Sequence, residues 1–390
     1  MSGVWDQVIG QPAVVAELQA AVADPTAMTH AWLFTGPPGS GRSVAARAFA
    51  AALQCPDGGL HPDVGTCHAC RTVLAGTHAD VQSVVPEGLS IGVAEVRELV
   101  RIAGRAPSQG RWQVVLVEDA DRMTEQASNT VLKMLEEPPA RTVFLLCAPS
   151  LHPDDVPVTI RSRCRVVGLR QPPVDAVADV LVQRDGVDPA LAAWSAAAAG
   201  GHVGRARHLA RDEDARLARK AVLDVPVSLV SLAACLNAAD DLVGAAKEES
   251  DRASAELDGA ETEAVKQSLG VGARGPGVAA ASRGAGQLKE LEKRQKSRAT
   301  RLCRDSLDRA LVDLAALYRD ALVIATSGGG DVSLAHPNRR ADAEELARRI
   351  GPEGALRRID AVLECRTALE QNVKPQIAVE ALTVALRLPS

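Results

Sequence analysis

A glycine-rich segment at residues 35–43, TGPPGSGRS, has the composition of a phosphate-binding loop. An apolar run at 31–34 precedes it and an alanine-rich helical pattern at 44–53 follows, so we expect the order strand, loop, helix. The glycines allow backbone N–H groups to face a phosphate, and the helix N-terminus adds partial positive charge. The candidate nucleotide contacts are Gly36, Gly39, Gly41, Arg42 and Ser43.

Two departures predict that this nucleotide site is degenerate. Arg42 stands where the pattern G-x-x-x-x-G-K-[ST] has lysine, and a wide planar guanidinium does not replace a compact ammonium. Glu118-Asp119 follows a buried-strand pattern, where hydrolases carry Asp to organise Mg²⁺ and then Glu to orient water. Because that order is reversed, we expect ATP and Mg²⁺ to bind weakly or not at all. An acidic strand end unrelated to nucleotides is the alternative.

Composition limits the class of protein. The 390 residues predict two or three domains, and 46% hydrophobic with 24% charged residues is ordinary for a globular protein. The net charge of −5 and the three Phe, one Tyr and four Trp argue against base-stacking platforms for single-stranded nucleic acid. Without an 18-residue apolar run or a signal-peptide pattern at 1–6, we expect a cytoplasmic protein whose cysteines are reduced or bind metal.

Hydrophobic periodicity predicts an α/β domain followed by helices. Strands are expected at 31–34, 81–85, 114–117, 143–147 and 165–169, and helices at 12–23, 44–53, 93–103 and 126–136. This alternation over 1–168 is typical of a parallel sheet. From residue 171 only helical patterns occur, apart from the stretch 270–286, whose Gly, Ala and Ser content predicts a flexible tip.

The two flanks of that stretch have opposite charge. Residues 240–266 carry nine acidic and three basic side chains, whereas residues 283–309 carry nine basic and four acidic ones. We therefore expect an antiparallel helical hairpin. Two solvated helix faces that never touch are the alternative.

Further motifs give the chain a family resemblance. Residues 132–139 (LKMLEEPP) and 159–164 (TIRSRC), with His30-Ala31-Trp32-Leu33-Phe34 before the glycine loop, resemble the clamp-loader branch of the AAA+ proteins. Within that branch the chain is most similar to the delta-prime family of the bacterial DNA polymerase III clamp loader. The resemblance is strong over 1–168, weaker over 169–240 and absent from the charged hairpin.

This resemblance implies a fold and a set of partners. The expected fold is an α/β AAA+ core with a RecA-like parallel sheet at 1–168, a small helical lid at 169–224 and an all-α collar at 225–390, with the hairpin inserted at about 240–300. The collar would join motor subunits and a delta subunit in a hetero-pentamer. That assembly would load the sliding clamp on primed DNA during replication, and no membrane partner is expected.

The departures at the nucleotide site bear on the role within that family. Besides Arg42 and the reversed acidic pair, Cys147-Ala148-Pro149 stands where motor subunits carry a polar sensor residue. These losses favour a non-catalytic stator subunit without intrinsic ATPase over an active motor subunit. Arg205 falls near the position of a sensor arginine in the lid, and a plain surface role is an equal alternative.

Arg163 belongs to a motif, Ser162-Arg163-Cys164, in which nothing is lost. In the family this arginine reaches the ATP of the neighbouring motor subunit in trans. A guanidinium suits that task because it spreads charge over the γ-phosphate oxygens. A surface arginine after a buried strand is the simpler alternative, and Arg161 is the nearest competitor for the role.

Cys55, Cys67 and Cys70 lie where the family carries a four-cysteine zinc module. The family spacing puts the fourth cysteine at position 64, which is Val64 here, so a tetrahedral zinc site needs another ligand. The side chains that could supply it are His61, Asp63 and His68, of which His61 is the tentative choice. A zinc-free loop with three reduced cysteines is the alternative.

Two other functions compete with the stator subunit. One is a catalytically active AAA+ clamp-loader motor subunit. The other is a zinc-dependent DNA-binding or repair protein on a decayed ATPase scaffold, which the acidic net charge and the scarce aromatic residues oppose.

Overall fold

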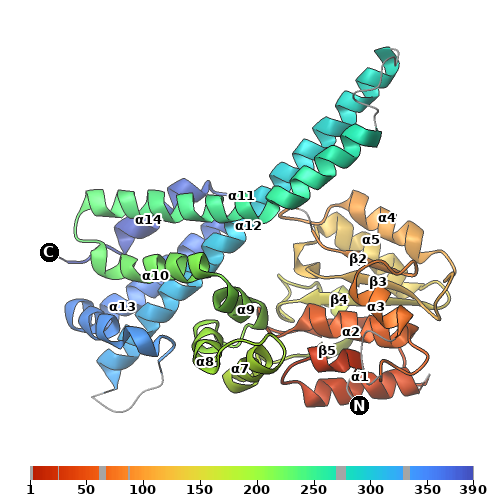
Figure 1. Ribbon diagram of the computed structural model, residues 1–390, viewed down its shortest axis with the longest axis horizontal. Helices are drawn as coiled ribbons and strands as arrows, with labels where there is room; N and C mark the ends of the chain where they lie inside the picture. Colours follow the sequence, from red (N-terminus) through yellow and green to blue (C-terminus); the bar gives the residue numbers. More distant parts are fainter. Residues whose placement is uncertain are drawn as a thin grey trace. The chain divides into compact units, whose positions relative to one another are not determined.

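The computed structural model describes residues 3–24, 26–60, 67–86, 88–268, 278–327 and 334–389. The chain forms two compact units, residues 1–211 and residues 212–390. Unit 1 contains a sheet with helices, and the regular structure described in unit 2 is helical (Figure 1).

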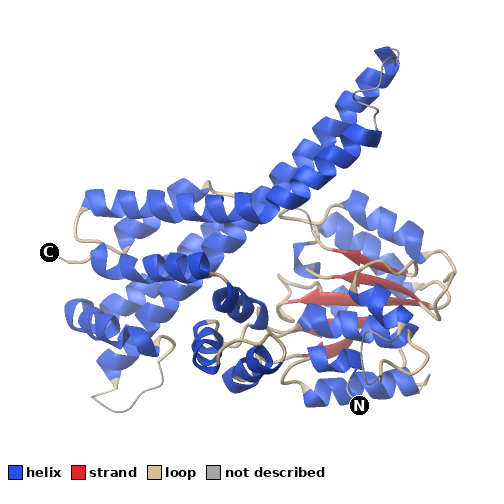
Figure 2. Ribbon diagram, viewed as in Figure 1, coloured by secondary structure: helices blue, strands red, loops and turns tan. Residues whose placement is uncertain are grey.

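Unit 1 is built on a five-stranded parallel sheet with the order β2-β3-β4-β1-β5 (Figure 2). Its strands are β1 (Ala31–Thr35), β2 (Val81–Val84), β3 (Gln113–Val117), β4 (Thr142–Ala148) and β5 (Arg165–Gly168). At the carboxyl end of β1, Thr35 pairs with Ala148 of β4 and Gly168 of β5. The glycine loop after β1 therefore lies at the edge of the sheet where parallel strands present ligand sites.

Helices cover both faces of this sheet. Alternate side chains of β1 and β4 point to opposite faces, and the apolar side chains on each face are buried against helices. One face packs against η1 (Gly3–Gln7), α1 (Pro12–Ala23), α2 (Arg42–Gln54) and α3 (His68–Leu74). The other packs against α4 (Val93–Ala103), α5 (Glu125–Glu136) and α6 (Val158–Arg161), with η2 (Ala120–Arg122) after β3. Three helices follow the sheet within unit 1: α7 (Val174–Gln183), α8 (Pro189–Ala198) and α9 (Val203–Arg211).

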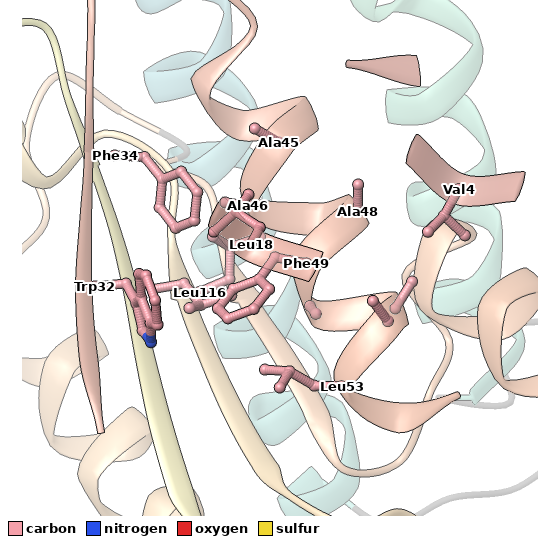
Figure 3. Packing of buried hydrophobic residues seen from close by; sticks show 14 of the residues in the cluster. Val4, Leu18, Trp32, Phe34, Ala45, Ala46, Ala48, Phe49, Leu53 and Leu116 are labelled. Atoms are coloured by element: carbon pink, nitrogen blue, oxygen red, sulfur yellow. The ribbon is translucent and has the colours of Figure 1, made fainter. Parts of the chain in front are cut away.

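Helix α2 packs close to the sheet because its buried face is made of small residues. Six of its alanines are fully buried, and Phe49 reaches toward Trp32 and Phe34 of β1 (Figure 3). The rings of Trp32 and Phe49 meet edge to face, with their centroids 4.9 Å apart. This packing fixes the glycine loop, because Gly41 caps α2 and Arg42 is its first residue.

Asp80 lies just before β2, at the end of the sheet opposite to the glycine loop, and its side chain binds the segment 108–110. Its carboxylate accepts hydrogen bonds from the backbone N–H groups of residues 108, 109 and 110 and from the Ser108 hydroxyl, at 2.6 to 2.8 Å. Burial opposes ionisation of this carboxyl, but the donors outweigh it and lower the pKa of Asp80 to about 2. The ionised carboxylate therefore stabilises unit 1.

Replacing Asp80 by asparagine is expected to destabilise unit 1 by about 2 kcal/mol at pH 7. Because the pKa of Asp80 is lower in the folded state, the stabilisation is complete above its ordinary pKa of 3.8 and is lost as the pH falls toward 2. Tryptophan fluorescence in urea measures the effect, since all four tryptophans lie in unit 1. The difference from the unmodified protein should shrink by about half at pH 3. An unchanged difference would contradict this role, and Asp179→Asn on the exposed side of α7 is the control.

Unit 2 consists of long helices around its own apolar core. They are α10 (Glu213–Ser228), α11 (Leu232–Ser268), α12 (Val278–Thr326), α13 (Arg340–Glu370) and α14 (Pro375–Ala385), with η3 (Pro337–Arg339) before α13. Leu314, Leu317 and Tyr318 of α12 are fully buried in this core. Helix α13 is kinked at Gly351, whose φ of 63° is left-handed and which precedes Pro352.

Helices α11 and α12 lie side by side and antiparallel, which confirms the hairpin predicted from charge (Figure 1). Arg298 of α12 binds Asp258 at 2.7 Å and Glu261 at 2.9 Å on α11. Farther along, Arg309 binds Glu249 at 2.6 Å. Ion pairs between the acidic and the basic helix therefore set their register.

Part of the predicted flexible tip is helical. The prediction was wrong for residues 278–286, which belong to α12, because consecutive alanines at 279–281 favour a helix. The remaining residues of that stretch, up to 277, lie outside the described ranges.

The predicted architecture is confirmed, an α/β part with a parallel sheet followed by helices. Helix α10, expected at the end of the lid, packs against α11 and α12 in unit 2. The three-part division at 168 and 224 stays a prediction. Among the described helices, none has the length and apolar character that crossing a bilayer requires.

Candidate functional site: a glycine loop under a helical lid

The glycine loop opens into a pocket of about 630 Å³ within unit 1. Three parts of the chain line it. The first is residues 7–9, and the second is residues 38–44, which span the loop and the start of α2. The third is a later group: Pro172, Arg184, His202, Val203, Gly204 and Arg207. Its volume lies within the range of about 300–1,000 Å³ that is usual for small-molecule sites. The pocket is therefore large enough for a nucleotide.

The structure separates the predicted contacts into two groups. Gly39, Gly41, Arg42 and Ser43 line the pocket. The lining does not include Gly36, Glu118 or Asp119.

Gly39 is required both by its backbone and by its neighbour. Its φ of +87° is left-handed, and a Cβ there would lie 2.7 Å from the Cβ of His202. His202 stands just before α9 and accepts a hydrogen bond at Nδ1 from the backbone N–H of Arg205, at 3.3 Å. The helical lid thus packs directly on the glycine loop.

Arg42 is bound to its own loop. One guanidinium nitrogen, Nη1, donates to the carbonyl of Gly36 at 2.7 Å, and Nη2 lies 3.9 Å from Asp119 Oδ1. The positive charge that a phosphate would use is therefore partly compensated within the chain. A second carboxyl, that of Asp121, also interacts with Arg42. Burial and the neighbouring Asp119 raise the pKa of Asp121, so this carboxyl ionises less readily than usual.

Glu118 is engaged away from the pocket. Its Oε1 accepts hydrogen bonds from Arg47 Nε at 2.8 Å and Ser83 Oγ at 3.1 Å, and it also contacts Arg47 Nη2. These contacts hold one of the two carboxylate oxygens of Glu118 on Arg47 and Ser83.

The end of β4 has no charged or polar side chain that could bind a nucleotide phosphate. Burial raises the pKa of the Cys147 thiol, which hydrogen-bonds Ser43, so the thiol stays neutral. The next residue, Ala148, has no polar side chain and contributes its carbonyl to Gly36 N–H at 3.4 Å. A sensor of the γ-phosphate is therefore missing from this position.

Sequence reasoning missed the lid residues that reach the pocket. Arg184, His202 and Arg207 line it, whereas Arg205, which the sequence suggested, does not. Arg207 also binds Asp185 at 2.7 Å. The available signal was the helix start at Val203, because positions 203, 204 and 207 share one helical face.

Arg163 lies outside the pocket of its own chain. It follows α6, and its guanidinium binds Glu136 Oε1 at 2.7 Å, the carbonyl of Thr159 at 2.9 Å and Ser162 Oγ at 3.2 Å. About a third of the side chain is exposed. Its competitor Arg161 donates to the carbonyl of Leu151 at 3.2 Å.

The three predicted cysteine ligands come together between α2 and α3. The Sγ atoms of Cys55, Cys67 and Cys70 lie within 4.8 Å of one another, with Cys55 and Cys67 3.8 Å apart. Three converging sulfur atoms fit part of a tetrahedral zinc site. His61, the tentative fourth ligand, and Val64 lie outside the described residues.

These features define a class of protein. A glycine loop between β1 and α2 of a parallel sheet, covered by the start of α9, is an arrangement that phosphate-binding domains use. Residues 10–173 match the family described as DNA polymerase III, delta subunit. This match covers 164 of the 390 residues, and this chain is also similar to proteins named DNA polymerase III subunit delta-prime.

Relatives of two kinds match part of the chain. The delta-prime subunit of DNA polymerase III from Bacillus subtilis is 33% identical over 165 residues, which are 42% of this chain and 49% of that protein. The delta-prime subunit of Escherichia coli is 38% identical over 146 residues, 37% of this chain and 43% of that protein. The tau subunit of B. subtilis is 32% identical over 161 residues, 41% of this chain and 28% of that protein. The chain spans less than half the length of each.

Two solved structures resemble the fold at low similarity. A gamma subunit-related protein of DNA polymerase III from Thermotoga maritima has a TM-score of 0.40 and 14% identity, covering 95% of this chain and 98% of that chain. The Holliday junction branch migration motor RuvB of the same organism has a TM-score of 0.36 and 17% identity, covering 59% of this chain and 81% of that chain.

Proposed function

We propose that this chain is a non-catalytic stator subunit of the DNA polymerase III clamp loader. The observation that carries the proposal is a contrast between two sites in unit 1. Its own nucleotide site has Arg42 bound to the loop and Glu118 bound to Arg47, whereas Arg163 stands outside that site on an exposed edge. An arginine placed there does not face its own pocket and can act on a ligand held by another molecule.

In this proposal the partners are those of the family. Arg163 acts in trans on the ATP of the adjacent motor subunit, and unit 2 assembles with motor and delta subunits in a hetero-pentamer. The complex opens the sliding clamp and places it on primed DNA in the cytoplasm.

The isolated chain is expected to show no ATP turnover above background. The physical reason is the missing set of groups: no lysine at position 42, an ion-paired Glu118 and no polar sensor at position 148. Steady-state phosphate release measures the turnover, and Ser43→Ala is the control that identifies contaminating activity. A rate near about 1 s⁻¹ that disappears in Ser43→Ala would support the active motor subunit instead.

The motor subunit is the second candidate because of one observation. The tau subunit of B. subtilis matches this chain at an identity similar to that of the delta-prime subunits. The ATPase measurement decides between the two functions, since only the motor subunit hydrolyses ATP alone.

We also propose that the cysteine cluster holds zinc. Cys55, Cys67 and Cys70 would supply three thiolates, and His61 is the proposed fourth ligand. Zinc would link the end of α2 to the start of α3 and so stabilise this part of unit 1.

A further inference from the structure

Arg163 is held in place by its own chain. Its Nη2 forms an ion pair with Glu136 Oε1 at 2.7 Å, and its Nη1 donates to the Thr159 carbonyl and to Ser162 Oγ. All of these acceptors lie in unit 1, so the guanidinium is retracted onto the chain that carries it. An arginine that is to bind a phosphate elsewhere must first leave them.

The strongest of these contacts joins two motifs. Glu136 is the last residue of α5, and Arg163 follows α6, which packs against α5. The C-terminal end of α5 also carries partial negative charge, which attracts a cation. The pair is accessible, with about half of the Glu136 side chain and a third of the Arg163 side chain exposed.

We propose that Glu136 is a positioning residue that keeps Arg163 retracted until a neighbouring subunit presents the γ-phosphate of ATP. This inference rests on the proposed function of Arg163. A carboxylate offers one negative charge and two acceptor oxygens, whereas a terminal phosphate carries about 1.5 to 2 negative charges and three acceptor oxygens. The guanidinium therefore exchanges Glu136 for ATP, and ADP, which lacks that phosphate, leaves the retracted pair intact.

The exposure of the pair makes this exchange possible. An exposed ion pair contributes little, so removing it should shift the exchange equilibrium by roughly 1.5- to 5-fold. A buried pair would hold the arginine too tightly for a neighbour's nucleotide to displace it. Glu136 thus raises the ATP concentration at which Arg163 binds the neighbour's ATP, but it does not prevent that binding.

The test uses the reconstituted complex with Glu136→Gln, and Glu137→Gln is the matched control. Glu137 is the adjacent carboxylate of the same motif, and the described residues show no ion pair for it. Glu136→Gln should lower the ATP concentration for half-maximal ATPase by about 1.5- to 5-fold without clamp and DNA. Glu137→Gln should not change it. The difference should disappear near 1 M salt, where charges are screened within about 3 Å.

A second measurement examines the pair without relying on the complex. In the isolated chain, the ¹⁵N-labelled guanidinium of Arg163, assigned with Arg163→Lys, should show slowed rotation and exchange that Glu136→Gln abolishes and Glu137→Gln retains. If Glu136→Gln leaves both this signal and the ATP dependence unchanged, the positioning role is overturned. If the signal changes but Arg163→Ala has no effect on the complex, the retracted pair stands and the proposed function of Arg163 fails.

Discussion

Replacing Arg163 by alanine should slow clamp loading by the assembled complex about tenfold, although we expect this chain to hydrolyse no ATP itself. An arginine finger contributes roughly 10³- to 10⁵-fold to turnover in GTPases. We expect a smaller loss here, because the other ATP sites of a multi-subunit assembly keep their own arginines. The measurement is ATPase stimulated by clamp and primed DNA, together with the rate of clamp loading.

The variants around Arg163 separate chemistry from folding. Arg163→Lys should recover only part of the rate, since an ammonium cannot bridge two phosphate oxygens in a fixed plane. Arg161→Ala is the control, because that arginine donates only to the carbonyl of Leu151 among its described contacts. Assembly should be unchanged in each variant. Clamp loading at the unmodified rate in Arg163→Ala would make this arginine a surface residue and remove the mechanism of the stator.

Replacing Cys70 by serine should reduce the zinc content of the purified chain from up to one ion per molecule to nearly none. Cys70 is fully buried and its sulfur converges with those of Cys55 and Cys67, so its loss leaves two thiolates. Structural zinc in small peptides binds with about 10–16 kcal/mol, and losing a ligand removes much of that affinity. Elemental analysis after purification without chelators measures the content.

The control for this experiment is Cys235→Ser, which alters a buried cysteine of unit 2 far from the cluster in sequence. It should leave the zinc content unchanged. Val64→Cys should make zinc harder to remove by a competing chelator, because it completes a four-cysteine site if the loop keeps the family geometry. Absence of zinc from the unmodified protein would refute the metal site and leave the fold unaffected.

Much of the fold could be predicted because local patterns agree with the tertiary structure. The helices expected at 12–23 and 93–103 begin and end at those residues. The five strands also lie where apolar runs placed them, within a residue or two. Three of them, β1, β3 and β4, are buried along their whole length, which requires cover on both faces, and the helices on each side provide it. Residues 278–286 were mispredicted because glycine suggested flexibility where neighbouring alanines extend α12.

The site was less predictable, because its pocket is assembled from distant segments. The glycine loop and Ser43 follow from a contiguous motif, so the sequence identified them. Arg184, His202 and Arg207 come from separate parts of the lid and carry no motif of their own. Their place depends on how α7 to α9 pack on the loop, which local composition does not encode.

The sequence by itself determined the strand, loop and helix order around the glycine loop, the opposite charges of α11 and α12 and the family resemblance, because each depends on residues that are neighbours in the chain. The tertiary structure alone decided which charged side chains are already bound by other groups of the chain. It pairs Glu118 with Arg47, turns Arg42 back to Gly36 and holds Arg163 at Glu136. These partners lie up to 71 positions apart in the chain. An ion pair depends on distance in space, which only the packing of helices on the sheet determines.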